Sequence, residues 1–459
     1  MRNCYKIYPL PFIMLFITAL GCLYSCSELL EIEPENNVSD RGIIVDRSSA
    51  EKALNGAYNG AARGLSSSTT SWNTAADNVV TYQRQGIIVA HLQASSGSSG
   101  YDANYTAINR LNSVIANVIA VSDSEFAGNS KEKILAQAYA LRALSYINLT
   151  VTFGAVPVVT QPSTATNQNG IKQSPREQVF GQALTDLNQA ETLFGSDNSI
   201  SDRGCISLWA VYALKARLYL YTEQWEKAEE YASKVIENTN AFGLTATPEG
   251  FFRTKKSRES IFEYPFSNSN KLPFYTNYLP STMGGRQDYV VSYDLANKLN
   301  DPAIGGNRRQ LIFRETQDET DQTYFVNEYA LTDGSSSIQT ARLAEQYLIR
   351  AEARLKKPIP DRNGAIADID VIKARATVAL LTASTVLTNE ELLLVIEDER
   401  RYELAFEGHR YFDIIRTGRA PQVFGVHEPQ YLDPRFWVFP FSSSELDYDH
   451  DLEQNEAYK

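Results

Sequence analysis

Amphipathic helices that come in pairs constrain the fold of this chain more than any other feature. Residues 207–238, SLWAVYALKARLYLYTEQWEKAEEYASKVIEN, repeat apolar residues at helical spacing on both sides of a short break, which predicts a helical hairpin. Residues 131–149 predict another strong amphipathic helix, which Gly154 and Pro157 are expected to end. We therefore expect a mostly α fold.

Small residues within the hairpin indicate how its helices pack. Ala216, Ala228 and Ala232 would let two antiparallel helices lie close together, as in a tetratricopeptide unit. Similar pairs are predicted at 131–194 and at 341–376. Repeated pairs of this kind predict a scaffold of stacked helix pairs.

Two stretches interrupt the helical pattern. Residues 48–117 are predicted to form a helix, a loop and a helix, because residues 64–104 are rich in Ser, Gly and Thr; Trp72 falls in this predicted loop. Residues 240–340 are rich in Gly, Pro, Asn, Tyr and Phe and contain only short β-like pieces such as residues 260–264. A long irregular insertion on a helical scaffold usually carries binding function.

The N-terminus has the pattern of an export signal. Arg2 and Lys6 precede an apolar run at 12–23, which is too short to span a bilayer. The run ends in Leu-Tyr-Ser-Cys, similar to a bacterial lipoprotein signal in which Cys26 becomes the acylated first residue. Simple secretion with an incidental cysteine is the alternative, and Cys22 is a weaker candidate anchor because it lacks the upstream Leu.

These boundaries predict the organisation of the chain. We expect a signal peptide at 1–25, an acidic tether at 26–47 and a single domain at 48–459. The domain divides into an N-terminal helical part, a loop-rich insertion and a C-terminal helical part, at 48–238, 239–340 and 341–459. The last part contains a helical block at 389–416 that opens with a capping box.

Composition excludes several classes of protein. The formal net charge of −12 argues against nucleic-acid binding, which needs basic stripes. Cys205 is the only cysteine beyond the signal region, so no disulfide framework is expected. No second apolar run approaches 18 residues, so no further membrane span is expected.

A dense ionic motif at 399–418 invites a catalytic interpretation. Glu399, Glu403 and Glu407 share one helical face, and a pair of carboxylates is what a glycosidase uses. However, each acid has an Arg within three or four positions, which lowers a carboxyl pKa and makes a poor general acid. We favour a salt-bridged helix pair held against the core, to which Arg410 and Asp413 contribute.

The other signals of enzymatic chemistry are missing from the sequence. The four histidines His91, His409, His427 and His450 have no partner at ligand spacing, so no metal site is expected. There is no Gly-x-Ser-x-Gly, no phosphate loop and no Cys–His pair. We expect no catalytic residue and no cofactor.

An ordered series of motifs along nearly the whole chain resembles the SusD/RagB family of surface nutrient-binding lipoproteins. Its pieces are Cys26 with CSELLEIEP, Tyr105-x-x-Ile108-x-x-Leu111-Asn112, AQAYALRALSYINLTVTFGAVPVVT (136–160), LTDLNQA (184–190), SLWAVYALKARLYLY (207–221), RLAEQYLIRAEA (342–353), DERRYELAFEGHRYFDIIRTG (398–418), FWVFPFSSSEL (436–446) and Gln454-Asn455-x-x-Tyr458.

The resemblance implies tetratricopeptide-like helix pairs that support an irregular, ligand-facing half. It also implies a lipid anchor in the outer membrane at the cell surface, and a SusC-like TonB-dependent transporter as partner. The implied ligand is a glycan or its oligosaccharides, bound without cleavage, although some members take peptides. A glycoside hydrolase and a purely structural assembly protein are the alternative functions.

Two aromatic-bearing segments are the predicted ligand site. The first contains Trp72 with Asp77 and Asn78, and the second runs from Tyr275 and Tyr278 to Arg286 and Tyr289. Both lie outside strong helical periods, and each mixes flat rings with amide, carboxylate or guanidinium groups. Sugar rings stack their C–H faces on aromatics and hydrogen-bond such groups, so we expect at least one of Trp72, Tyr275 and Tyr278 to stack on ligand.

Overall fold

The computed structural model of the protein describes residues 44–459 apart from 84–85, 89–98, 165–169, 273, 317, 319–320, 330, 332, 382–386 and 427. The predicted signal peptide at 1–25, the predicted lipidation site Cys26 and most of the predicted tether at 26–47 lie outside the described residues.

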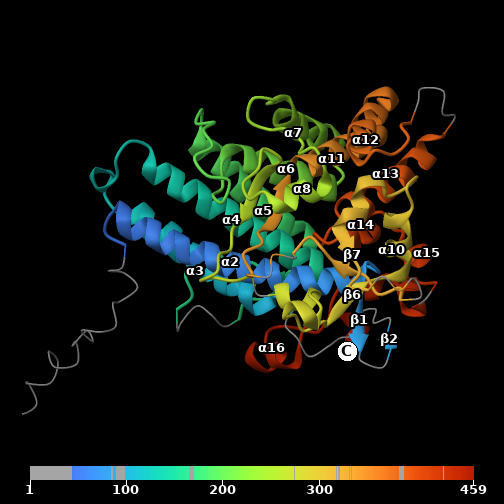
Figure 1. The fold of residues 1–459 in the computed structure, drawn as a ribbon. Coiled ribbons are helices and arrows are strands. Elements are labelled where there is room, and N and C mark those ends of the chain that lie inside the picture. The colour runs from blue at the N-terminus through green and yellow to red at the C-terminus, as the bar shows by residue number, and fades with distance from the viewer. Residues whose placement is uncertain are drawn as a thin grey trace, which may run out of the picture.

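Long helices packed in antiparallel pairs form the N-terminal part of the molecule (Figure 1). They are α2 (Arg47–Ala75), α3 (Tyr101–Ala120), α4 (Ser130–Phe153), α5 (Arg176–Phe194), α6 (Leu208–Tyr221) and α7 (Trp225–Glu237). Helix α2 packs on α3, α4 on α5, and α6 on α7. The predicted mostly α fold, the hairpin at 207–238 and the pair at 131–194 are confirmed.

Helix α2 corrects the prediction of a loop from residue 64 onward. It continues to Ala75, so Trp72 is helical. Its Ser and Thr hydroxyls bond backward to the preceding turn, for example Thr69 Oγ1 to the Leu65 carbonyl at 2.8 Å. These bonds satisfy the hydroxyls inside the helix. Gly64, which has no side chain, lets α2 lie close to Asn104 of α3. Tertiary packing thus overrides a composition typical of loops.

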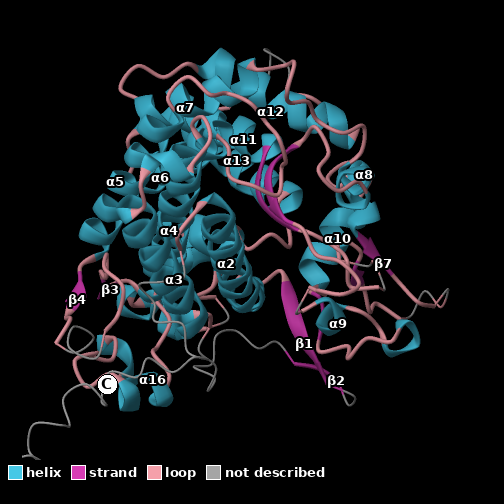
Figure 2. Cartoon of the chain, turned by 90° about the vertical axis from the view of Figure 1, so that its left-hand side faces the viewer, coloured by secondary structure: helices cyan, strands magenta, loops and turns pink. Residues whose placement is uncertain are grey.

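The middle of the chain contains short elements. Its helices are α8 (Pro248–Arg253), α9 (Tyr275–Tyr278) and α10 (Tyr293–Asn300). Among the described residues, the strands are β1 (Val79–Gln83), β2 (Gly86–Ile88), β3 (Val156–Pro157), β4 (Gln173–Ser174), β5 (Ser260–Tyr264), β6 (Tyr289–Val291), β7 (Ile312–Phe313), β8 (Phe325–Val326) and β9 (Ile338–Arg342). Figure 2 shows the stacked helices on one side and β1, β2, β7 and α8–α10 on the other.

Strand pairing brings distant segments together. Strands β2, β1 and β6 form an antiparallel sheet in which Thr81 lies opposite Tyr289. Strand β5, which was predicted from residues 260–264, pairs with β9, while β3 pairs with β4 and β7 with β8. The sheet of β1 and β6 therefore joins the two predicted ligand-binding segments.

The C-terminal part returns to helices. They are α11 (Leu343–Lys356), α12 (Arg362–Ala376), α13 (Asn389–Glu403), α14 (Arg410–Arg416), α15 (Ala420–Val423) and α16 (Ser443–Tyr448). The predicted pair at 341–376 is α11 with α12, and the predicted capping box opens α13 at Thr388 and Glu391. Between α13 and α14, Gly408 has a φ of +83°, and a Cβ there would lie 2.7 Å from the ring of Trp72. Only glycine fits this close contact without strain.

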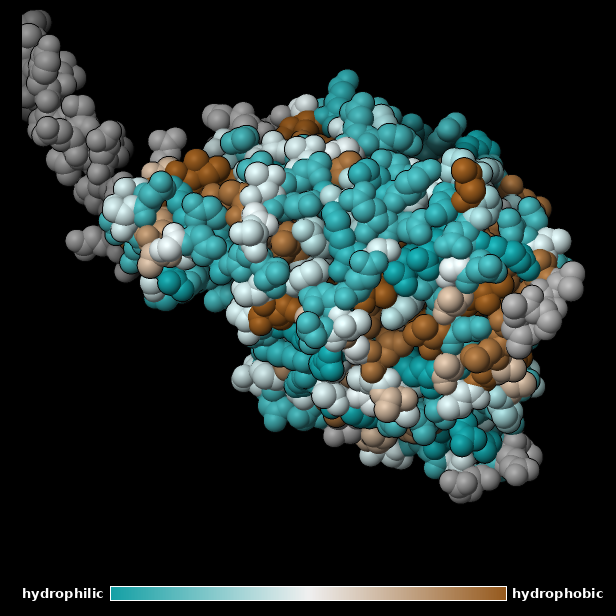
Figure 3. Space-filling model, turned by 90° about the horizontal axis from the view of Figure 1, so that it is seen from above, coloured by the Kyte–Doolittle hydropathy of each residue, from teal (hydrophilic) through white to brown (hydrophobic). Residues whose placement is uncertain are grey.

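One hydrophobic core connects the ends of the described chain, since its buried members run from Ile44 to Leu452. Seen from the α7 and α12 end, the surface is mostly hydrophilic, and the hydrophobic residues that it shows gather toward its right-hand side (Figure 3). Exposed apolar residues of α12, α13 and the segment between them include Val371, Leu380 and Leu394. Among the described helices, none combines the length and the apolar character needed to cross a membrane.

Candidate functional site

The predicted segment from Tyr275 to Tyr289 folds back on itself. Its turn is closed by a hydrogen bond from the Arg286 backbone N–H to the Thr276 carbonyl at 2.7 Å, and α9 packs on β6. Tyr275 and Tyr289 are partly exposed. The Arg286 side chain is 70% exposed and pairs with Asp288 at 2.9 Å. We call Tyr275, Arg286, Asp288 and Tyr289 the tyrosine surface.

Tyr278, by contrast, lies beneath this surface. It is fully buried, and its ring contacts those of Tyr289 and Tyr329 with centroids 5.7 and 5.9 Å apart. Burial raises the pKa of its hydroxyl, which lies beside Asn73 and Thr70 of α2. The ring has no free face for a sugar, so the prediction that Tyr278 is a stacking residue is corrected: it supports Tyr289.

Trp72 is a core residue, which corrects its predicted place at the ligand. Only 4% of it is exposed. Its indole N–H donates to Thr152 Oγ1 at 2.9 Å, and its ring packs edge-on against Phe412 with centroids 4.8 Å apart. The tryptophan therefore fastens α2 to α4 and α14.

Asp77 and Asn78 connect α2 to the C-terminal helices. Asn78 is fully buried, donates to the Ala405 carbonyl at 2.5 Å and accepts from Arg401 at 3.2 Å. Asp77 lies 3.1 Å from Arg401 and 3.5 Å from Arg410. Since these polar groups are committed to protein partners, the predicted ligand-binding role of Asn78 is corrected, and Asp77 is held in ion pairs.

Two aromatic residues near the tyrosine surface were not predicted from the sequence as ligand-binding residues. Tyr82 and Phe313 pack, partly exposed, on the small cluster of Val80, Val290 and Phe325. Tyr82 lies on β1, inside the stretch expected to be a loop. The alternation of apolar residues from Val79 to Tyr82 was the available signal, but four residues are too few to establish a strand period.

A set of buried charges, which we call the ionic cluster, lies where α11, α12 and α13 meet β5. Its members are Glu259, Arg308, Arg342, Arg375, Glu399, Glu403 and Glu407. Arg342 bonds Glu259 and Glu403 at 2.8 Å and Glu407 at 2.7 Å. Arg308 bonds Glu399 at 2.6 Å, and Arg375 bonds Glu259 at 2.7 Å. The predicted salt-bridged interpretation of residues 399–416 is confirmed.

The charges of this region determine what its carboxylates can do. Burial by itself would raise the pKa of Glu403, but the guanidinium groups of Arg375, Arg342 and Arg308 outweigh it and hold that pKa at about 2. In the same way, Arg400 and Arg416 overcome burial and hold the pKa of Asp413 at about 2. Such groups stay ionised at neutral pH and cannot act as general acids.

Two other acids behave differently. Burial raises the pKa of Glu328 and of Glu407. Neighbouring carboxylates raise both values further: Glu407 and Glu403 act on Glu328, and Glu403 also acts on Glu407. Glu328 is only 2% exposed. Glu407 borders a hollow of about 30 Å³, which is the volume of one water molecule. A sugar cannot reach either carboxyl group through this hollow.

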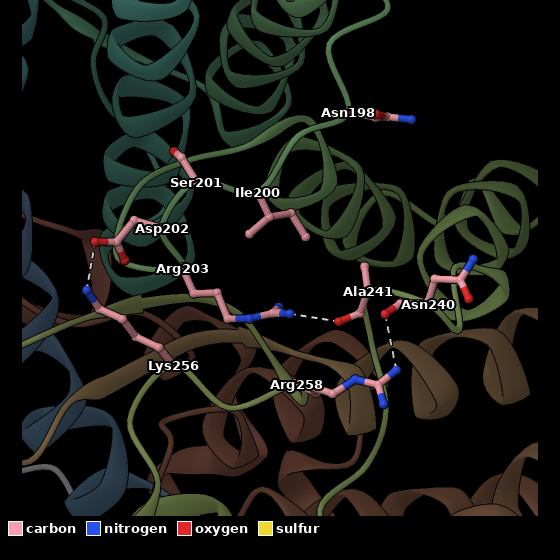
Figure 4. Close-up of a pocket in the computed structure, with 9 residues that line it drawn as sticks. All are labelled: Asn198, Ile200, Ser201, Asp202, Arg203, Asn240, Ala241, Lys256 and Arg258. Carbon is pink, nitrogen blue, oxygen red and sulfur yellow. Dashed lines mark hydrogen bonds and ion pairs between the residues drawn. The ribbon is translucent and has the colours of Figure 1, made fainter.

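A polar cavity of about 580 Å³ lies between the α5–α6 loop and residues 240–258 (Figure 4). Arg203 donates to the carbonyls of Ser260 and Ala241, and Arg258 donates to those of Thr239 and Asn240. Lys256 pairs with Asp202 at 2.7 Å. Because these donors already hold the surrounding loops, we interpret the cavity as a structural junction. Across the residues the structure describes, no group of three or more His, Cys, Asp or Glu is arranged to hold a metal ion.

Fold and surface together define a class: a scaffold of helix pairs that presents a partly exposed aromatic surface from its loop-rich half. Comparisons with known proteins identify the family. One family model, described as "SusD family", matches residues 317–458, and another, described as "Starch-binding associating with outer membrane", matches residues 30–220. The chain belongs to the SusD/RagB family.

The chain is similar to individual members of this family over most of its length. A SusD-like protein of Formosa agariphila is 25% identical, with 97% of this chain and 98% of the relative covered. A SusD superfamily structure from Bacteroides vulgatus is 18% identical with a TM-score of 0.77, covering 90% of this chain and 99% of that one. A structure described as a laminarin binding SusD-like protein is 22% identical with a TM-score of 0.72, covering 90% and 100%.

Proposed function

We propose that this protein is a non-catalytic lipoprotein of the outer membrane surface that binds glycans and delivers them to a SusC-like TonB-dependent transporter. The observation that carries the proposal is the tyrosine surface, where partly exposed Tyr275 and Tyr289 lie with the ion pair of exposed Arg286 and partly exposed Asp288. Flat rings beside a guanidinium and a carboxylate match the C–H faces and hydroxyls of a sugar.

Family membership supports this function, since one structural relative is described as binding laminarin and one matching family model as starch-binding. The same family description associates its members with the outer membrane. For the transporter, the exposed apolar residues of α12, α13 and the segment between them, Val371, Leu380 and Leu394, offer apolar contacts.

The rival hydrolase would require two accessible carboxyl groups on opposite sides of a glycosidic bond, one of them protonated. The carboxylates at 399–416 are instead buried against arginines. Incubation of the purified protein with glycans should release no new reducing ends. Release of reducing ends would favour the hydrolase.

The ligand is tested first with a glycan array and a peptide panel, and then by calorimetry with the best glycan. The double variant Tyr275→Ala/Tyr289→Ala should lose at least tenfold in affinity, because loss of an aromatic platform costs about 2 kcal/mol or more. Tyr448→Ala is the matched control, since Tyr448 is 91% exposed on α16. Equal affinity in the double variant and the wild type would remove the tyrosine surface from the site. Peptide binding alone would change the ligand class, and binding of neither with a stable transporter complex would favour the assembly protein.

The anchor is tested separately. Cys26→Ala should move the protein from the membrane fraction to the soluble fraction, because each buried CH₂ of an acyl chain contributes roughly 0.8 kcal/mol. Cys22→Ala is the control and should stay in the membrane fraction. The measurement belongs in cells without the transporter, so that protein contacts cannot retain the variant; retention there would contradict the assignment of Cys26.

A further inference from the structure

A second cavity, of about 740 Å³, lies between the helices and the C-terminal segment. Its volume falls within the roughly 300–1,000 Å³ that is usual for small-molecule sites. Its walls come from α4, α5, α6, α14 and the turn before residue 439, and they include Phe180, Tyr221, Phe412, Trp437 and Val438. None of these residues belongs to the tyrosine surface.

Arg176, the first residue of α5, lines this cavity, and no described residue forms a hydrogen bond or an ion pair with its side chain. Its Nε is buried without a hydrogen bond, and among the described residues no carboxylate pairs with it. Burial lowers the pKa of its guanidinium. Arg176 as a whole is only partly exposed, and a partly buried guanidinium without a carboxylate partner favours an incoming anion. The N-terminus of α5, a helix of 19 residues, adds a positive dipole end at the same place.

The other arginine of the cavity is a useful contrast. Arg416 donates to Glu352 at 2.6 and 2.7 Å and to Asp413 at 2.9 and 3.0 Å. Its charge is therefore neutralised by the protein. Glu177 and Glu223 also line the cavity, but both are exposed, so water weakens their repulsion of an anion.

The aromatic wall suits a ring rather than a bare ion. The indole N–H of Trp437 donates to the Tyr431 carbonyl at 3.0 Å, which fixes the orientation of its ring. Burial raises the pKa of Tyr221 to about 12, so its hydroxyl stays protonated, and no described residue accepts from it. A fixed flat ring, a free hydroxyl donor and a free guanidinium are complementary to a sugar that carries a negative group.

We propose that this cavity is a second binding site, which takes a sugar residue bearing one anionic group, either a carboxylate or a sulfate ester. Arg176 binds the anionic group, and Trp437 and Tyr221 contact the ring. The site is separate from the tyrosine surface, and it does not depend on the glycan that the tyrosine surface takes.

The test is calorimetry on the detergent-solubilised full-length protein with D-glucuronate, glucose 6-sulfate, glucose and acetate. We expect D-glucuronate or glucose 6-sulfate to bind at least tenfold more tightly than glucose and than acetate, and the stronger of the two identifies the anionic group. Equal binding of glucose would overturn the role of the anion, and equal binding of acetate would overturn the role of the ring. A dissociation constant of 10 mM corresponds to a binding free energy of about 2.7 kcal/mol at 298 K. If neither anionic sugar binds at that concentration, the proposal of a second site is wrong.

Variants locate the binding. Arg176→Gln should lower the affinity for the anionic sugar at least tenfold without lowering the melting temperature, since it removes a partly buried charge that has no carboxylate partner among the described residues. Arg435→Gln is the matched control, because Arg435 is 57% exposed on the neighbouring turn and pairs with Asp433. Trp437→Phe provides a second measurement should Arg176→Gln fold poorly, and it should weaken binding severalfold. Unchanged affinity in Arg176→Gln, or in Trp437→Phe where that variant is used, contradicts the proposal. Loss of binding in Tyr275→Ala/Tyr289→Ala instead would place the anionic sugar on the tyrosine surface.

Discussion

In the ionic cluster, Arg342 is 2% exposed and bonds three glutamates, whereas Arg286 on the tyrosine surface is 70% exposed and pairs with a single aspartate. Both regions combine arginine with carboxylates, yet their environments give these groups different roles. A buried charge without a partner is costly, and the charges of the ionic cluster are held in ion pairs. Exposed charges exchange water for a ligand at little cost, so they remain available for binding.

The same comparison distinguishes the aromatic residues. Trp72 uses its N–H and its ring entirely within the protein, while Tyr275 keeps part of its ring at the surface. Residue type alone therefore does not identify a ligand-binding residue. What identifies it is a polar or aromatic group that the protein leaves without a partner, and three changes test this rule.

The largest effect is expected at Asp413. Asp413→Ala leaves Arg400 without the carboxylate that it bonds at 2.7 Å, while Arg416 loses a bond of 2.9 Å and keeps Glu352. The change should lower the free energy of unfolding by about 3–5 kcal/mol, because Arg400 is buried. Arg410→Ala should cost less, because Arg410 lies 3.4 Å or more from Glu397 and Asp77. Denaturant unfolding measures both. A loss of glycan binding with unchanged stability would instead make this region part of a ligand site.

The next effect is the pH dependence of stability. Burial lowers the pKa of His409 from 6.5 to about 3. The unfolded chain therefore takes up a proton below pH 6.5 that the folded protein does not bind until about pH 3. The contribution of His409 to the free energy of unfolding should be fully present above pH 6.5. It should decrease as the pH is lowered, by on the order of 3 kcal/mol at pH 4.

Denaturant unfolding between pH 7 and pH 4 tests this dependence. His409→Gln should flatten the slope, whereas exchange of the exposed His450 for Gln should leave it unchanged. Identical slopes for wild type and His409→Gln would show that His409 is not held neutral. Glu403 and Asp413, with lowered pKa values of about 2, add a further loss at lower pH.

The smallest effect separates the two kinds of aromatic residue. Trp72→Phe removes the hydrogen bond to Thr152 and leaves a void beside Phe412, so it should lower the free energy of unfolding by about 2 kcal/mol without changing glycan affinity. Tyr275→Ala should do the reverse, with a stability change within about 1 kcal/mol and weaker glycan binding. If Trp72→Phe weakens glycan binding and leaves stability unchanged, the comparison fails.

The sequence by itself determined the helical scaffold. Apolar periodicity at 131–149 and 207–238 and the capping box at Thr388 are local patterns, and local patterns are sufficient for helices. It also indicated that the acids of residues 399–416 pair with arginines, but only the Arg416–Asp413 pair has helical spacing. Glu399 pairs instead with the distant Arg308, a partner that the tertiary structure supplies. The ordered motifs were sufficient to indicate the family.

Only the tertiary structure decided which side chains remain free. Trp72, Asn78 and Tyr278 resemble loop residues in sequence, yet all three are buried. Trp72 contacts α4 and Asn78 contacts α13, and both helices are distant along the chain. Tyr278 lies beside α2, a helix whose composition is typical of a loop. Arg176 is the opposite case, because its sequence neighbours do not predict a binding residue. Its lack of a partner among the described residues follows from the place where α5 meets the C-terminal turn. Availability to a ligand depends on long-range contacts, and a sequence pattern records only the neighbours along the chain.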